Sequence, residues 1–252
     1  MSGLFGNLSN NGLEETRDSI GGFSPLNSGI YTGKVKLAYA GQSASGARNI
    51  TLVVALPDRE YRETIYITNR AGENWFLNPN DKTKKVPLPG FTIMDDLCLV
   101  TSGKPLAEQD TEKKVVNIYD YDAKKELPKS VDVLTDIIGL EVSLGILRNL
   151  ENKSEKQGND YVPTAETREV NTIDKVFHTE TKMTVVEARN GQTEPAFWEA
   201  WESRNKDQTR DRRTVKDGQA GAVGKPQTAP KSGPPQQNTT ATAPRTSLFG
   251  KK

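Results

Sequence analysis

The sequence predicts a mainly β fold, in which a small barrel is followed by a disordered basic tail. Apolar and polar residues alternate with a period of two over residues 31–39 and 50–56, which is typical of half-buried strands. One stretch of helical periodicity, from Phe91 to Cys98, interrupts the strand-rich region. From Lys206 onward Pro, Gly, Gln and Thr dominate. A segment of that composition buries too little apolar surface to offset its chain entropy, so we expect it to be disordered.

The elements are expected in a definite order along the chain. Residues 1–29, rich in Gly, Asn and Ser, form a flexible N-terminal segment. Asn69-Arg70-Ala71-Gly72 is interpreted as a hairpin turn between two strands, and Gly103 and Pro105 end the helix that begins near Phe91. Strands are expected at 31–39, 50–56, 61–68, 74–77, 115–121, 140–147 and 169–177, a loop at 151–166, and helices near 185–189 and 194–205.

Three meandering strands, a helix and then closing strands are the order of a five-stranded OB-fold-like Greek-key barrel with an inserted helix. The same order fits other small barrels. The amphipathic helix at 194–205 carries Phe197, Trp198 and Trp201 on one stripe. We expect this stripe to dock on the barrel, and the alternative is a surface for self-association, including self-association on DNA.

Charge is distributed unevenly along the chain. Lys and Arg number 34 against 33 Asp and Glu, a net charge of +1, but residues 206–252 alone carry +7, which leaves −6 on residues 1–205. This asymmetry argues against a uniformly basic duplex-binding surface, although a local basic groove remains compatible with it. The single cysteine, Cys98, excludes an intramolecular disulfide and favours a reducing interior. No signal peptide or membrane-spanning run is recognised, so we expect a soluble cytoplasmic protein without membrane partners.

Cations and aromatic residues concentrate between Lys34 and Lys85. If Val35 and Ile65 face the core, the strand positions beside them face outward, and the next hairpin adds further rings with Lys82, Lys84 and Lys85 just beyond. Single-stranded DNA requires this combination, because its phosphates attract cations and its exposed bases stack on rings. The candidate DNA-binding residues are Trp75, Tyr66, Phe76, Arg62, Lys34, Lys36 and Arg70.

An ordinary structural explanation exists for each of these residues. Aromatic residues and Thr are good strand formers, and Lys on an outer strand face is commonly solvated. Trp75 is as compatible with core packing as with binding, and Phe76 is the better core residue if Trp75 points outward. Tyr31, Tyr39 and Tyr61 are expected to pack in the interior.

Signals for catalysis are weak, and we expect neither catalytic residues nor a metal or cofactor. One histidine, His178, and one cysteine exclude a structural zinc site, and no complete phosphate-binding loop occurs. Asp174, Glu180 and Lys182 have the residue types of a Mg²⁺-dependent nuclease, an arrangement that chance often produces in a charged chain. The nuclease remains an alternative.

The chain ends in Ser247-Leu-Phe-Gly-Lys-Lys252, a compact docking peptide after a long tether. Ser2-Gly-Leu-Phe-Gly6 is similar to it, and coincidence explains the match equally well. The alternative for the C-terminal segment is a basic end that adds non-specific DNA affinity.

The strand-rich body together with this terminus resembles the single-stranded DNA-binding proteins of the enquatrovirus-type podoviruses (Schitoviridae). The stretches Arg168–His178 and Thr184–Arg189 add to the resemblance, which is loose over residues 30–205 and close over the last six. It implies an OB-fold and roles in phage DNA replication and recombination. It also implies that the tail contacts host RNA polymerase to activate late transcription, with Ser247, Lys251 and Lys252 as the activating residues. In the family an aromatic residue of the hairpin serves DNA binding, and Trp75 matches that position.

These observations predict three regions: a flexible segment at 1–29, an OB-fold single-stranded DNA-binding domain at 30–205, and a disordered basic tail at 206–252 that ends in a partner-binding motif. The expected protein is a non-enzymatic bacteriophage protein of the bacterial host's cytoplasm that binds single-stranded DNA and host RNA polymerase. The alternative is a transcriptional adaptor or scaffold whose barrel binds protein rather than DNA.

Overall fold

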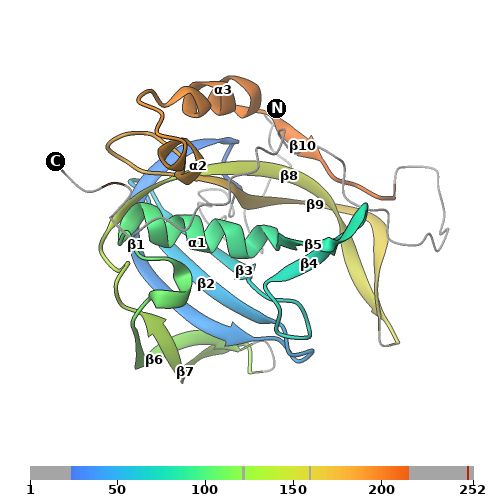
Figure 1. The fold of residues 1–252 in the computed structure, drawn as a ribbon. Coiled ribbons are helices and arrows are strands. Elements are labelled where there is room, and N and C mark those ends of the chain that lie inside the picture. Colours follow the sequence, from blue (N-terminus) through green and yellow to red (C-terminus); the bar gives the residue numbers. More distant parts are fainter. Residues whose placement is uncertain (1–23, 121–122, 159, 216–248, 250–252) are drawn as a thin grey trace, which may run out of the picture.

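The computed structural model describes residues 24–120, 123–158, 160–215 and 249. The predicted mainly β class is confirmed, and the helices are short (Figure 1). The strands are β1 Gly29–Gln42, β2 Arg48–Ala55, β3 Glu60–Tyr66, β4 Trp75–Asn78, β5 Asp81–Pro87, β6 Thr111–Asp120, β7 Lys125–Leu134, β8 Glu141–Gln157, β9 Asp160–Phe177 and β10 Thr209–Asp211. The helices are α1 Pro89–Thr101, η1 Leu106–Glu108, α2 Val185–Arg189 and α3 Ala196–Asn205.

One eight-stranded sheet contains every strand except β4 and β5, which pair with each other. β1, β2 and β3 form an antiparallel meander. The N-terminal half of β1 also pairs with β8, and β8 pairs with β9 along its length. β7 pairs with β1 at Tyr39 and with β6, and β10 runs parallel to β8.

Two of the expected connections are wrong. The turn at Asn69–Gly72 does not join paired strands, because β4 pairs with β5 rather than with β3. Residues 151–166 are not a loop: they form the outer half of the long β8–β9 hairpin. Their charged, exposed side chains show no apolar periodicity, so the sequence gives no strand signal here. Backbone pairing between the two strands stabilises the segment.

The body also extends beyond both expected boundaries. Ser28 lies within the segment expected to be flexible, yet its hydroxyl accepts a hydrogen bond from the Arg148 amide at 2.8 Å. β10 and the following residues lie within the expected tail. The Asn152 side-chain oxygen accepts hydrogen bonds from the amides of Thr214 and Val215, at 2.7 and 3.0 Å. Backbone pairing and one buried amide therefore fix a segment whose composition suggested disorder.

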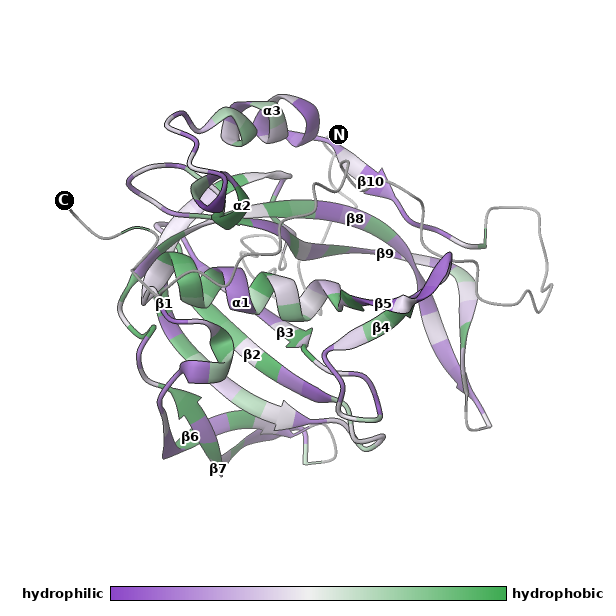
Figure 2. Cartoon of the chain, in the orientation of Figure 1, coloured by the Kyte–Doolittle hydropathy of each residue, from purple (hydrophilic) through white to green (hydrophobic). Residues whose placement is uncertain are grey.

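The cross-strand register separates the two faces of the β1–β2–β3 meander. Leu52 and Val54 lie on the inner face, with Val35 and Ala38 opposite them on β1. These residues are 0 or 1% exposed and form the main core together with α1, whose Met94, Leu97 and Cys98 are fully buried. Figure 2 shows the hydrophobic residues concentrated on the β1–β2 region and α1, whereas the outer part of the β8–β9 hairpin is mostly hydrophilic.

A glycine allows α1 to begin directly against β3. A Cβ atom on Gly90 would lie 2.2 Å from the Tyr66 carbonyl oxygen, a distance that no larger residue tolerates. α1 thereby packs against β3, β8 and β9. The predicted helix is confirmed, and its close packing depends on this position.

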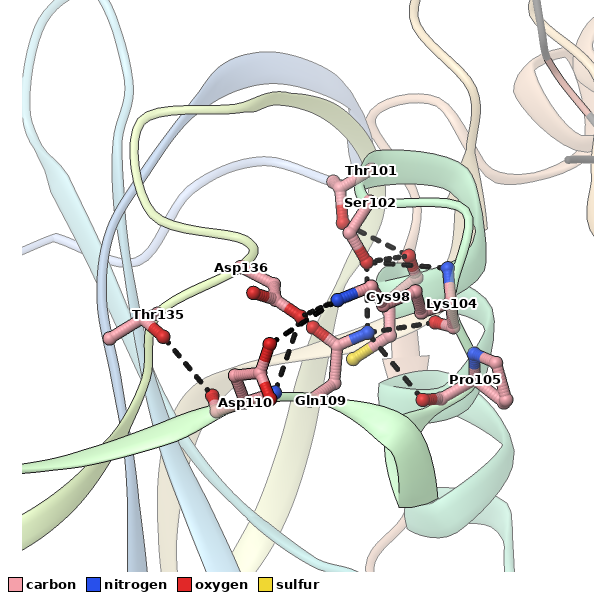
Figure 3. Close-up of polar contacts among 9 residues, drawn as sticks. All are labelled: Cys98, Thr101, Ser102, Lys104, Pro105, Gln109, Asp110, Thr135 and Asp136. Carbon is pink, nitrogen blue, oxygen red and sulfur yellow. Dashed lines mark hydrogen bonds and ion pairs between the residues drawn. The ribbon is translucent and has the colours of Figure 1, made fainter.

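A polar cluster after α1 fixes the start of the β6–β7 hairpin (Figure 3). The Lys104 ammonium lies 2.8 Å from Asp136 and 3.4 Å from Asp110. Hydrogen bonds with these carboxylates raise the pKa of Lys104, and the hydrogen bond with Lys104 lowers the pKa of Asp136. Gln109 donates hydrogen bonds to Ser102 and to the Lys104 carbonyl, each at 2.8 Å. The cluster is structural: it joins the end of α1 to the β6–β7 hairpin.

The sheet is open between β3 and β9. Within the described ranges, no ladder joins these strands, and the barrel is not closed. A side chain bridges the seam instead: Glu63 Oε2 accepts hydrogen bonds from the Ile173 amide at 2.9 Å and from the Tyr61 hydroxyl at 2.6 Å. Burial raises the pKa of Glu63. A cavity of about 220 Å³ lies beside the seam and is lined by Leu26, Arg59, Glu60, Tyr61, Arg62 and Asn171.

α3 docks on the sheet through its tryptophan stripe, as expected. Trp201 is 4% exposed and packs with Leu147 and Phe177 in a second, smaller cluster. Its indole N–H donates to Asp174 at 2.7 Å. Gly145 of β8 leaves room for the ring, because a Cβ there would lie 3.0 Å from it. Phe197 remains 37% exposed at the edge of this cluster.

Candidate nucleic-acid interface

The outer face of β3 presents a tyrosine and an arginine. Arg62, Thr64 and Tyr66 alternate with the inward-facing Tyr61, Glu63 and Ile65, and they lie opposite Val53, Thr51 and Asn49 of β2. Tyr66 is 52% exposed and Arg62 is exposed, as predicted. Thr64 is held by a 3.0 Å hydrogen bond between its hydroxyl and that of Thr51. Tyr39 and Tyr61 are buried, as expected.

The β4–β5 hairpin carries the second group of rings. Trp75 is half-buried, and the Lys85 ammonium lies 3.8 Å from the centre of its ring, a cation–π contact. Phe76 is 40% exposed, so Trp75 is the more buried ring of the pair, and the condition under which Phe76 was expected in the core, an outward-facing Trp75, is not met. A two-stranded hairpin has no second layer to bury alternate residues, and both faces of β4 therefore stay accessible.

The tip of the β8–β9 hairpin carries a third ring, which the sequence analysis missed. Tyr161 is 71% exposed and lies directly opposite Lys156 in the strand register. In the view of Figure 1 this hairpin extends well beyond the body. The signal was present in the sequence: Gly158 and Asn159 form a dipeptide that often joins two strands. Treating the region as a loop concealed it.

Two of the predicted cations have carboxylate partners. Lys34 lies 3.7 Å from Glu141, and Lys36 pairs with Glu60. They lie near the opposite end of the meander from Tyr66, because Lys34 aligns with Ala55 and Tyr66 aligns with Asn49. The structure therefore does not bring Lys34 and Lys36 together with the rings, and their charges are partly neutralised.

Arg70 lies in the turn between β3 and β4 and is exposed. Its carbonyl lies against the β1–β2 loop, 3.3 Å from where a Cβ on Gly46 would be. The Asn69 side-chain oxygen accepts hydrogen bonds from the amides of Ala71 and Glu73, each at 2.9 Å, which fixes the turn. Arg70 thus lies in the turn that connects Tyr66, at the end of β3, to the β4–β5 hairpin.

The surface defined by these residues has cations without a carboxylate at ion-pair distance. Across the described ranges, no ion pair involves Arg62, Arg70, Lys82, Lys85 or Lys156. Lys84 pairs with Asp81 at 3.4 Å. We call Arg62, Tyr66, Arg70, Trp75, Phe76 and Lys85, together with Lys156 and Tyr161, the ring–cation surface.

One of the three residues proposed for a nuclease, Asp174, is engaged in other contacts. Asp174 accepts the Trp201 hydrogen bond and lies 3.8 Å from Arg210. No cluster of three potential metal ligands occurs in the described part of the chain. None of its helices is long and apolar enough to cross a membrane.

The predicted partner-binding residues Ser247, Lys251 and Lys252 lie outside the described residues. Comparison of the chain with family models, curated proteins and solved structures found no match in any of the three. The resemblance to podoviral single-stranded DNA-binding proteins thus remains a prediction.

Proposed function

We propose that this protein binds single-stranded DNA on the ring–cation surface of an OB-like body, and that its C-terminal segment recruits host RNA polymerase. One observation carries the DNA-binding part: β3, the β4–β5 hairpin and the β8–β9 tip each carry an exposed or half-buried ring and a cation, with the ring and the cation adjacent in the last two. Stacked bases and neutralised phosphates are what such pairs offer an unpaired strand.

The strand order supports the OB-like part of the proposal. β1, β2 and β3 are followed by α1, and β8 then returns to β1 with β9 beside it. This order supports assignment of β1, β2, β3, β8 and β9 to the strands of an OB-like body, with β6, β7 and the β4–β5 hairpin as additions. OB folds bind oligonucleotides on the face of the second and third strands and on neighbouring loops. The outer face of β3 and the adjoining hairpins carry the ring–cation surface, which supports this comparison for the third strand, whereas Asn49, Thr51 and Val53 on the same side of β2 are buried.

Oligo-dT binding across a salt series tests the proposal. Each stacked base contributes about 1–3 kcal/mol, so we expect Tyr66→Ala and Trp75→Ala each to weaken binding by about tenfold or more, since about 1.4 kcal/mol corresponds to tenfold. Tyr119→Ala is the matched control, because Tyr119 of β6 is 45% exposed but lies outside this surface. Wild-type affinity in the double variant, or equal or stronger binding to duplex, would contradict the proposal.

Tail function is separable from DNA binding. Deleting residues 247–252 should leave oligo-dT affinity unchanged and abolish capture of host RNA polymerase. Persisting capture would refute the role assigned to Ser247, Lys251 and Lys252. A complete lack of salt-sensitive DNA affinity would instead support the adaptor alternative.

A further inference from the structure

The loop between β9 and α2 holds the chain's single histidine in a fixed orientation. His178 receives the Thr181 amide hydrogen on Nδ1 at 3.2 Å, and the Thr181 hydroxyl lies 3.0 Å from the same nitrogen. Backbone hydrogen bonds between His178 and Met183, and between Lys182 and His178, close the loop at 2.9 and 2.8 Å. Nδ1 is thus an acceptor, and the imidazole has little freedom to rotate.

An aromatic residue from the far end of the sequence covers this imidazole. The Phe249 ring lies parallel to it, with centroids 4.4 Å apart and an interplanar angle of 11°. Phe249 is also partly buried against the main core cluster. A residue 71 positions further along the chain, from Leu248-Phe-Gly250, therefore occupies a defined place on the body.

We propose that the His178 loop is an intramolecular docking site for the C-terminal Leu-Phe-Gly motif, and that docking withholds the tail tip from its partner. The withholding part rests on the proposed function of the tail. An imidazole with one ring face against a phenyl group, beside an apolar core, recognises a flat apolar side chain. A contact this small is reversible, and reversibility is needed if the His178 loop is to compete with the partner for the same motif.

Proton NMR of the histidine ring tests docking directly. With one histidine in the chain, its two ring C–H signals are unambiguous, and a stacked phenyl group shifts them upfield. Phe249→Ala should abolish this shift. Phe5→Ala is the matched control, since Leu4-Phe5-Gly6 has the same motif, and it should leave the shift intact. A shift that survives Phe249→Ala, or is lost in Phe5→Ala, overturns the proposal.

A second measurement separates binding at this site from misfolding of a variant. The synthetic peptide Thr246–Lys252, added to protein lacking these residues, should restore the upfield shift saturably. The same peptide with Phe249→Ala should not. Absence of any response to the unmodified peptide would refute docking.

Capture of host RNA polymerase measures whether docking at His178 competes with binding of the tail tip to the polymerase. His178→Ala should increase capture severalfold because the tip no longer has a competing site. The competition is refuted if His178→Ala leaves polymerase capture unchanged under two conditions. The unsubstituted protein must capture polymerase, and Phe249→Ala must abolish the histidine shift. If no variant captures polymerase, the proposed tail function fails, whereas the NMR result still decides docking.

Discussion

Two neighbouring aspartates in α1 should have opposite effects on stability. Burial raises the pKa of Asp96 to about 6, and the positive charge of Arg189 opposes part of this rise. The folded chain thus retains a proton that the unfolded chain releases near pH 4. Stability falls as pH rises from about 4 to about 6, and it stays lower above that range.

We therefore expect Asp96→Asn to raise the free energy of unfolding at pH 8, by up to about 3 kcal/mol for a shift of about two pKa units. The gain should shrink towards pH 4, as urea denaturation at both pH values would show. Asp95→Asn is the control: Asp95 accepts a hydrogen bond from the Leu106 amide at 2.8 Å, and a weaker acceptor should lower stability at both pH values. An equal gain for Asp96→Asn at pH 4 and pH 8 would exclude this explanation.

At the scale of elements, α3 depends on one of its large apolar residues. Trp201 is buried and hydrogen-bonded to Asp174, whereas Phe197 is 37% exposed. Trp201→Ala should cost about 3–5 kcal/mol, the usual range for removing a buried aromatic side chain. Phe197→Ala should cost about 1 kcal/mol, in line with ordinary single substitutions. Thermal unfolding of the two variants measures the difference, and equal losses would show that the whole stripe carries the docking.

Sequence patterns predicted most elements in which local periodicity matched burial, although β7 was missed despite its buried Val133 and Leu134. The alternation around Val35 and Ile50, and the helical spacing of Met94 and Cys98, correspond to faces that are buried. The outer half of the β8–β9 hairpin was missed because it is stabilised by strand pairing, which leaves no apolar signal. Pairing of β4 with β5 was missed for a related reason: the turn at Asn69 is a genuine turn, but turn residues do not identify which strands pair.

The candidate site was predictable only in part. Exposure of Tyr66 and Arg62 followed from strand alternation around Ile65, which is 5% exposed. The ion pairs of Lys34 and Lys36 were not predictable, because their partners Glu141 and Glu60 come from other strands. Long-range contacts of this kind depend on register, which one sequence does not specify.

At the scale of the whole molecule, the seam between β3 and β9 depends on Glu63. Glu63→Leu removes the acceptor for the Ile173 amide, and leaving a buried donor unpaired costs about 1–3 kcal/mol. We expect hydrogen exchange at the Ile173 amide to accelerate by about tenfold or more, since about 1.4 kcal/mol corresponds to tenfold. Glu63→Gln keeps an acceptor of the same length and should change the rate only slightly. Equal rates in both variants would show that the bridge does not hold the seam.

The anchoring of residues 214 and 215 on Asn152 sets an upper limit on the distance between the C-terminal tip and this point of the body. Asn152 aligns with Thr167 of β9, so the anchored residues 214 and 215 lie eleven residues of β9, or about 35 Å along the strand, from His178. The 33 residues between Val215 and Phe249 can span about 110 Å at full extension. The connecting segment at full extension is therefore about three times longer than the distance from its anchor to the His178 loop. If copies bind side by side on one DNA strand, as proposed, each C-terminal tip reaches the His178 loop of its neighbour, and exchange of tips between bodies breaks no β-strand pairing.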